Sequence, residues 1–259
     1  PDLPILRQEL DSARHQLGTL GGGNHFIEFL ADGKGCLWVM LHSGSRNFGF
    51  RAAHAYHQQA RALCDRRRIE LPDRDLAYLP MDEQSGQDYL AAMTYCLAFA
   101  RANRARMMSV ILEILHRETG ATPVQELDIH HNYAALERHY GREVWVHRKG
   151  ATRARAGETG IVPGSMGSPS YLVEGLGNPE SFQSCAHGAG RRMGRKEAGR
   201  KLVLAEEQAK LAGILHGLRS RSDLDEAPSA YKDIDAVMEN QRDLVRITTR
   251  LKPLASIKG

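Results

Sequence analysis

The chain has 259 residues, 42% of them hydrophobic, which is enough to bury a core in one large domain or two small ones. It contains no run of about 18 apolar residues, and its opening segment PDLPILRQEL lacks the basic and apolar regions of a secretory signal, so we expect a cytoplasmic protein without membrane contact. The net charge is only +4, but arginines cluster at 65–68, 147–155 and 191–201, which indicates either a phosphate-rich partner such as RNA or a nucleotide, or solvated helix faces.

The cysteines are Cys36, Cys64, Cys96 and Cys185, which lie far apart and form no CxxC pair. A chain of this length does not need disulfides to stabilise its core, so we expect reduced thiols. The pattern also excludes a zinc finger. The chain begins with Pro1 instead of Met, and we therefore expect a processed or truncated product.

The predicted elements follow in chain order. Residues 18–41 alternate turns with short apolar runs and predict a pair of strands, and residues 87–117 carry helical spacing without proline and predict one long helix or two in succession. Strands are predicted at 143–150 and 171–177, and an amphipathic helix at 198–220 that ends near Gly217. We find no repeat and no linker. The sequence therefore predicts a mixed α/β (α+β) fold in a single domain over residues 1–259.

Histidines recur where a predicted strand or turn ends: His25 in GGGNHFIEF, His42 in MLHSGSRNFG, His130 and His131 in DIHHNYA, and His187 in CAHGAG. Functional sites are commonly built at such ends, and imidazoles from distant segments can converge on one metal ion. A single histidine at such a place is more often a hydrogen-bonded, half-buried side chain, and it is the recurrence of the pattern that favours a site. Their spacing does not identify the metal.

Amides and glycine-rich loops accompany these histidines. Asn24 precedes His25 and Asn132 follows His131, and the loop at 160–171 carries several serine hydroxyls. Such groups can hold phosphate, although plain turns have the same composition. The segment HGAGRRMG departs from the dinucleotide-binding fingerprint and follows no clear strand, and P-loop, HExxH and GxSxG motifs are absent from the sequence.

Several blocks together resemble the RtcB family of RNA-splicing ligases, in the family's order and from Gly18 to the last residue. They are GTLGGGNHFIEF, LHSGSRNFG, HHNYA, HRKGAT, GIVPGSMGSPSY, SCAHGAGRRMGR, EAPSAYKDID and LKPLASIKG. The resemblance implies that family's mixed α/β fold with a central cleft for metal and nucleotide. It also implies GTP and Mn²⁺ as cofactors and RNA as the partner, for example tRNA halves, with 2′,3′-cyclic phosphate or 3′-phosphate ends joined to 5′-hydroxyl ends.

The resemblance also assigns roles to residues. His187 matches the nucleophile that carries GMP, and His25, His42 and His131 match manganese ligands. The matched nucleotide-binding positions are Asn24, His25, Phe26, Ile27, Glu28, His131, Asn132, Pro163, Gly164, Ser165, Met166, Ser170, Gly188, Ala189, Gly190, Tyr231 and Lys258. Glu28 matches a guanine-reading carboxylate, for which the alternative is an outward-facing strand residue. Lys258 matches a lysine that reaches guanine and is otherwise a frayed end. The expected contacts for RNA or the reacting phosphates are Arg46, Arg191 and Arg195.

The sequence departs from the family in one respect. The DxGCG block that supplies further metal ligands is missing, and Cys36 in GKGCLW has no acidic partner. We therefore expect that the family's N-terminal third is absent, with weaker metal binding as a result. Two alternatives stay open: an RNA-binding remnant without catalysis, and a metal-dependent phosphohydrolase that uses the same histidines. The sequence does not indicate protein partners or an oligomeric state.

Overall fold

The structure is a computed structural model that describes residues 3–259. The chain forms two compact units: one comprises Pro1–Gly21 and Ser43–Glu126, and the other Gly22–His42 and Leu127–Gly259. Helices and strands occur together, which confirms the predicted mixed α/β fold. The single domain expected from the sequence stays a prediction. Within residues 3–259, no helix is both long and apolar enough to cross a bilayer.

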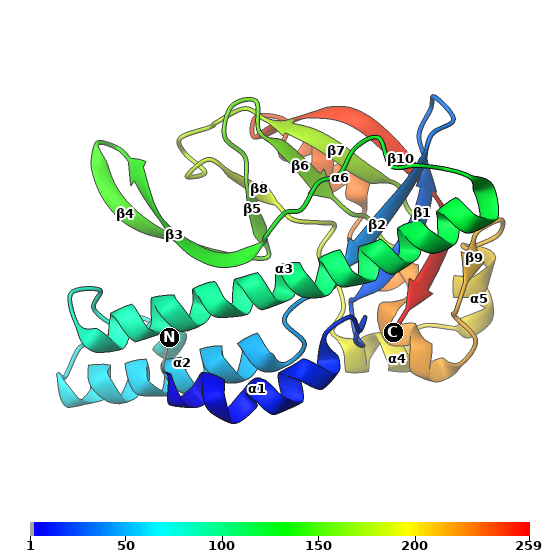
Figure 1. The fold of residues 1–259 in the computed structure, drawn as a ribbon. Helices are drawn as coiled ribbons and strands as arrows, with labels where there is room; N and C mark the ends of the chain where they lie inside the picture. Colours follow the sequence, from blue (N-terminus) through cyan, green and yellow to red (C-terminus); the bar gives the residue numbers. More distant parts are fainter. Residues whose placement is uncertain (1–2) are drawn as a thin grey trace. The chain divides into compact units, whose positions relative to one another are not determined.

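The first unit is helical (Figure 1). Its helices are α1 (Pro4–Gln16), α2 (Phe48–Arg66), the short 3-10 helix η1 (Arg74–Leu76) and α3 (Gln84–Thr119). The prediction of a long helix is confirmed, and α3 is one continuous helix. It is capped by Gly120, whose φ of +71° is readily adopted by glycine and whose N–H donates to the His116 carbonyl at 2.8 Å.

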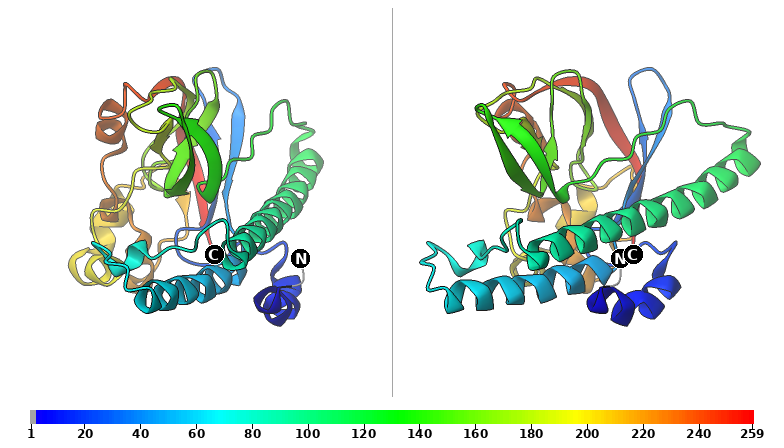
Figure 2. Two further views of the ribbon diagram at one scale, coloured as in Figure 1. Left: turned by 90° about the vertical axis from the view of Figure 1, so that its left-hand side faces the viewer. Right: turned by 60° about the vertical axis from the view of Figure 1, so that its left-hand side comes forward.

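The apolar faces of these helices form the core of the first unit. Phe48, Ala52 and Tyr56 recur every four residues on α2, so they lie on one face and are buried. They pack in one cluster with Ala92 and Cys96 of α3. The views of Figure 2 show α2 beside α3 accordingly.

Asn103 of α3 is fully buried and joins two loop segments of the first unit. Its Oδ1 accepts hydrogen bonds from the N–H groups of Gly18 at 2.6 Å and Thr19 at 3.2 Å. Its Nδ2 donates to Ser43 Oγ at 3.0 Å and to the Gly44 carbonyl at 3.2 Å. Asn103 thus anchors the chain directly before and directly after the stretch that contributes a hairpin to the second unit.

The second unit contains a sheet with the strand order β2–β1–β10–β7–β6, to which β9 adds by parallel pairing with β10 (Figure 1). Its strands are β1 (Phe26–Ala31), β2 (Leu37–His42), β6 (Thr159–Val162), β7 (Ser170–Gly175), β9 (Leu215–His216) and β10 (Val245–Lys258). Two further pairs are β3 (Asn132–His139) with β4 (Arg142–Lys149), and β5 (Ala151–Arg153) with β8 (Ser184–Ala186). The strands predicted at 18–41, 143–150 and 171–177 are confirmed.

The helices of the second unit are short: α4 (Arg195–Lys201), α5 (Leu204–Ala209), η2 (Arg221–Glu226), η3 (Pro228–Ala230) and α6 (Ile234–Glu239). The single helix predicted at 198–220 is wrong. The chain is extended at Leu202 and Val203, so α4 and α5 are separate helices, and Leu215 already belongs to β9. Leu202 packs against a buried cluster with Leu211, which shows tertiary packing overriding helix propensity.

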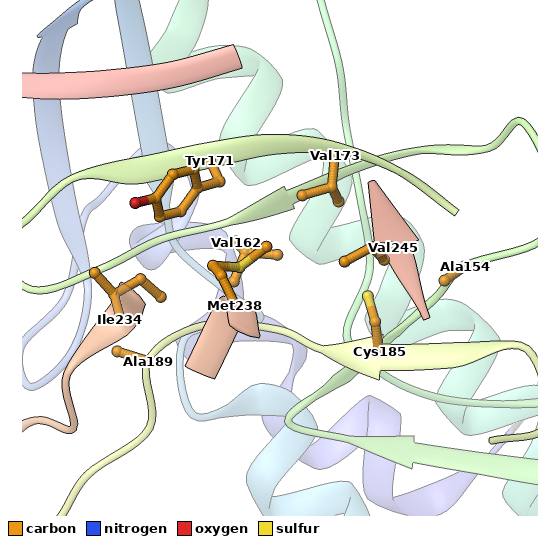
Figure 3. Packing of buried hydrophobic residues seen from close by; sticks show 9 residues of the cluster. All are labelled: Ala154, Val162, Tyr171, Val173, Cys185, Ala189, Ile234, Met238 and Val245. Carbon is orange, nitrogen blue, oxygen red and sulfur yellow. The ribbon is translucent and has the colours of Figure 1, made fainter. Parts of the chain in front are cut away.

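The core beside the sheet supports the segment that carries His187 (Figure 3). Val173 and Val245 from neighbouring strands pack with Ile234 and Met238 of α6. Cys185 of β8 is buried in the same cluster, two residues before His187. The segment HGAGRRMG, for which the sequence indicated no preceding strand, therefore does follow one, although β8 is only three residues long. All four cysteines are free thiols, as expected.

We predict that Asn103→Leu destabilises the protein by roughly 2 to 4 kcal/mol, because it leaves buried backbone groups without partners. Urea unfolding monitored by circular dichroism measures this change. The exposed Gln87 of the same helix provides the matched control, and Gln87→Leu should shift stability by less than about 0.5 kcal/mol. Equal stability of the two variants would contradict the anchoring role of Asn103.

Candidate functional site

The hairpin of β1 and β2 brings two histidines together. His25 directly precedes β1, and His42 is the last residue of β2. The antiparallel register pairs Phe26 with His42, so the strand ends are adjacent. The ring centroids of His25 and His42 lie 5.6 Å apart.

His131 and His187 extend this pair into a cluster of four imidazoles. His131 directly precedes β3, and its ring centroid lies 5.0 Å from that of His42. His187 directly follows β8, and its ring stacks on His131 at 5.0 Å with an interplanar angle of 14°. Gly150 N–H donates to the His131 carbonyl at 3.0 Å, next to the β5–β8 pairing, which aligns the two segments. Histidines far apart in the sequence therefore meet within the second unit.

The surroundings of His42 and His187 favour neutral imidazoles. Burial is the main cause that lowers the pKa of His42 to about 3, and the neighbouring histidines and Lys258 lower it further. Burial also lowers the pKa of His187, against a hydrogen bond with the Gly150 backbone that raises it. A neutral imidazole has a nitrogen lone pair available for a metal ion or for attack on an electrophile.

The donor chemistry of the cluster suits a transition metal. Two imidazoles that bind one ion at about 2.1 Å have ring centroids roughly 5 Å apart, which is the spacing found here. Among residues 3–259, however, no group of three or more His, Cys, Asp or Glu side chains is arranged to hold a metal ion. The three-histidine set His25, His42 and His131 therefore stays a prediction.

A buried carboxylate and a lysine lie beside the cluster, at the paired ends of β1 and β10. Glu28 is only 3% exposed and accepts a hydrogen bond from Ser256 Oγ at 3.2 Å. Lys258 pairs with Phe26, and its Nζ lies 5.2 Å from the centre of the Phe26 ring. The alternatives of an outward-facing Glu28 and a frayed Lys258 are wrong.

The segment after His187 packs against the serine loop. The N–H of Ala189 donates to the Pro163 carbonyl at 2.9 Å, and a Cβ on Gly188 would lie 3.1 Å from the same oxygen. Within the loop, Ser170 Oγ accepts from Gly164 N–H at 3.1 Å, and Ser165 N–H donates to Ser168 Oγ. The hydroxyls that the sequence offered for phosphate binding thus order the loop itself.

The other predicted residues of the second unit surround these groups. Asn24 is exposed, Asn132 Oδ1 accepts from Gly150 N–H at 3.2 Å, Ile27 pairs with Ile257, and Met166 is buried. The Gly190 carbonyl accepts from Lys232 N–H at 2.9 Å, and Arg191 forms a bridge with Tyr231, so Tyr231 is fixed to the segment that follows His187.

The three predicted arginines have different surroundings. Arg191 and Arg195 form ion pairs with Glu226, and the side chain of Arg195 is 52% exposed. A Cβ on Gly23 would lie 2.7 Å from the Arg195 guanidinium, so the glycine permits this approach. Arg46 belongs to the first unit, where its Nε donates to Thr19 Oγ1 at 3.1 Å.

Sequence reasoning missed Glu226. It lies in the quoted block EAPSAYKDID but received no role, and the local sequence carries no signal that distinguishes it from an exposed glutamate. In the structure it is 5% exposed and contacts several predicted site residues.

Comparisons with known proteins agree in one family. The family described as "tRNA-splicing ligase RtcB" matches residues 4–259. The chain is 44% identical to the RNA-splicing ligase RtcB of Escherichia coli K12, over 94% of this chain and 61% of the relative. It is 38% identical to the RNA-splicing ligase RtcB of Mycobacterium tuberculosis (94% and 65%) and 34% identical to the tRNA-splicing ligase RtcB of Pyrobaculum aerophilum (95% and 60%). The chain thus spans less than two thirds of the length of these relatives.

The buried Glu28 makes stability depend on pH. Burial raises its pKa from the ordinary 4.5 to about 7, against the lowering effects of Lys258 and Ser256. The folded chain therefore binds this proton more tightly than the unfolded chain, and the resulting stability is present below pH 4.5 and is lost as the pH rises through 7. We predict that Glu28→Gln equals the wild type near pH 4.5 and exceeds it by roughly 3 kcal/mol at pH 8.

Urea unfolding of both proteins across this pH range measures the difference. Glu180→Gln, at an exposed position, controls for the loss of a surface carboxylate. A wild type more stable than Glu28→Gln at pH 8 would show that the charged carboxylate is well compensated, which would contradict the prediction.

Proposed function

The chain belongs to the RtcB family, and from this premise we propose that it carries the nucleotidyl-transfer site of an RNA ligase that uses GTP and Mn²⁺. The ligase joins RNA ends bearing a 2′,3′-cyclic phosphate or a 3′-phosphate to 5′-hydroxyl ends. The observation that carries the proposal is the position of His187, stacked on His131 within a cluster of four histidines.

In the first step, a ring nitrogen of His187 attacks the α-phosphorus of GTP. A nitrogen–phosphorus bond forms, the bond from the α-phosphorus to the bridging oxygen breaks, and pyrophosphate leaves with the electron pair. The step requires a neutral imidazole, and the lowered pKa of His187 supports this state at neutral pH. The hydrogen bond with the Gly150 backbone fixes one ring nitrogen, so the other is available for attack.

In the following steps, His187 transfers GMP to the RNA 3′-phosphate, and the RNA 5′-hydroxyl attacks this activated phosphate and expels GMP. A cyclic phosphate is first hydrolysed to a 3′-phosphate. Splitting the reaction in this way makes each bond exchange a displacement at phosphorus with a good leaving group.

The proposed ligands for Mn²⁺ are the imidazoles of His25, His42 and His131. The lowered pKa of His42 and the close ring spacing support this assignment. A bound divalent ion would supply charge stabilisation at the phosphate oxygens.

The proposed base pocket is formed by Glu28 and Lys258, with Phe26 beneath the ammonium group. A charged Glu28 can accept from both N1–H and the exocyclic amine of guanine, which compensates a carboxylate that is costly to bury alone. Arg195, half exposed, and Arg191 are proposed to contact the RNA or the reacting phosphates.

We predict that the full-length protein incubated with Mn²⁺ and GTP labelled at the α-phosphorus acquires a covalent label that is labile in acid, as expected for a phosphoramidate. His187→Ala should abolish the label. The matched control is His147→Ala, at an exposed histidine of β4, which should keep it.

Other outcomes would identify the alternatives. An acid-stable adduct would exclude a histidine adduct. Salt-dependent RNA binding without labelling would indicate a binding remnant. Release of free phosphate without ligation would indicate a phosphohydrolase.

A further inference from the structure

We propose that Glu226 is a positioning residue that sets purine specificity by holding Lys258 in place and linking it to the arginines that follow His187. The inference rests on the proposed function, which places guanine beside Lys258. The family resemblance assigns no role to Glu226, and the assignment comes from its contacts.

Glu226 contacts side chains from separate segments of the second unit. Its Oε1 lies 3.0 Å from the Arg191 guanidinium and 3.4 Å from that of Arg195, and its Oε2 lies 3.6 Å from Lys258 Nζ. Its Oε2 also accepts a hydrogen bond from the Tyr231 hydroxyl. The carboxylate is buried, so solvent screens these interactions little.

The backbone around Glu226 fixes its position. Glu226 ends η2, and η3 begins two residues later at Pro228. Leu224 and Ala227 on either side are buried in one apolar cluster, which anchors the segment. The carboxylate is therefore held by its own segment while it orders the side chains that surround it.

Burial and nearby carboxylates have opposite effects on the pKa of Lys258. Burial lowers the pKa of the ammonium group, whereas Glu226 first, and Glu28 and Asp225 after it, raise it. Phe26, beneath the ammonium group, is apolar, and His42 near it has a strongly lowered pKa. Glu226 is thus the carboxylate that most strongly opposes the lowering of the Lys258 pKa by burial, and its Oε2, 3.6 Å from Lys258 Nζ, restrains the position of the ammonium group.

A fixed, charged lysine can distinguish purines. Guanine presents an acceptor at O6, where adenine presents an amino donor. A lysine ammonium group donates to the first and repels the second. Without Glu226, Lys258 would lose the ion pair that holds its ammonium group in place, so discrimination between GTP and ATP should weaken.

The experiment measures dissociation constants of GTP and ATP for the wild type, Glu226→Gln and Glu226→Asp by titration calorimetry. We expect Glu226→Gln to reduce the GTP-over-ATP preference by about tenfold or more, the scale of one charge-assisted hydrogen bond. Glu226→Asp keeps the charge at a shorter reach and should recover part of the preference.

Glu207→Gln provides the matched control. Glu207 is also buried, pairs with Lys210 at 2.6 Å and accepts from Ser229 N–H at 3.0 Å. This variant should lose stability without losing purine preference. If Glu226→Gln fails to fold, the test uses Glu226→Asp in a Lys258→Met background. There the Asp substitution should leave the remaining preference unchanged, because Glu226 acts through Lys258.

Two results would overturn the inference in distinguishable ways. A wild-type protein that binds GTP no better than ATP would overturn the proposed function and this inference with it. A preference for GTP that survives in Glu226→Gln would overturn only the role of Glu226. The same holds if Glu226→Asp reduces the GTP-over-ATP preference equally in the wild-type and in the Lys258→Met background.

Discussion

The register between β1 and β10 is the constraint on which the site depends. It pairs Phe26 with Lys258 and Glu28 with Ser256, so the lysine lies over an aromatic ring and the buried carboxylate has a hydroxyl partner. A slip of one residue would turn Glu28 and Lys258 to the other face of the sheet. The register shifts between Phe29 and Leu30, where Leu30 faces Pro253, and such irregularities are among the places where a strand accepts a proline.

Much of the site could be predicted from the sequence because its histidines stand at strand ends. His25 and His42 flank a hairpin that the alternation of turns and apolar runs in the sequence predicted, and their proximity follows from antiparallel pairing. The stacking of His131 on His187 could not be derived in this way, because it depends on β5 pairing with the three-residue strand β8. The break near Val203 was likewise unpredictable, because Leu202 and Leu204 on either side of it both pack against one buried cluster, which includes residues far along the chain such as Met166 and Leu224.

The second unit buries carboxylates in different ways, and the differences have chemical consequences. Glu137 is matched by Arg148 at 2.6 Å, and hydrogen bonds from Arg148 hold its pKa near 2, despite burial that acts in the opposite direction. Burial raises the pKa of Glu28 to about 7, and Lys258 and the Ser256 hydroxyl offset only part of that rise. A carboxylate that its own protein leaves undercompensated has unused acceptor capacity for a ligand, whereas one that is fully paired serves the fold.

The glycines around His187 differ in the space beside them. The resemblance assigns residues 188–190 to nucleotide binding, which stays a prediction. A Cβ on Gly188 would lie 3.1 Å from the Pro163 carbonyl oxygen, whereas a Cβ on Gly190 would meet no atom within 4 Å. The glycine that the His187 ring requires is Gly150, at φ +68°, where an added Cβ would lie 3.2 Å from the imidazole carbon Cε1. A substitution at Gly150 would strain the backbone and would also bring a Cβ too close to the His187 ring. Gly150 therefore positions His187 in two ways, by leaving room for the ring and by a backbone hydrogen bond to it.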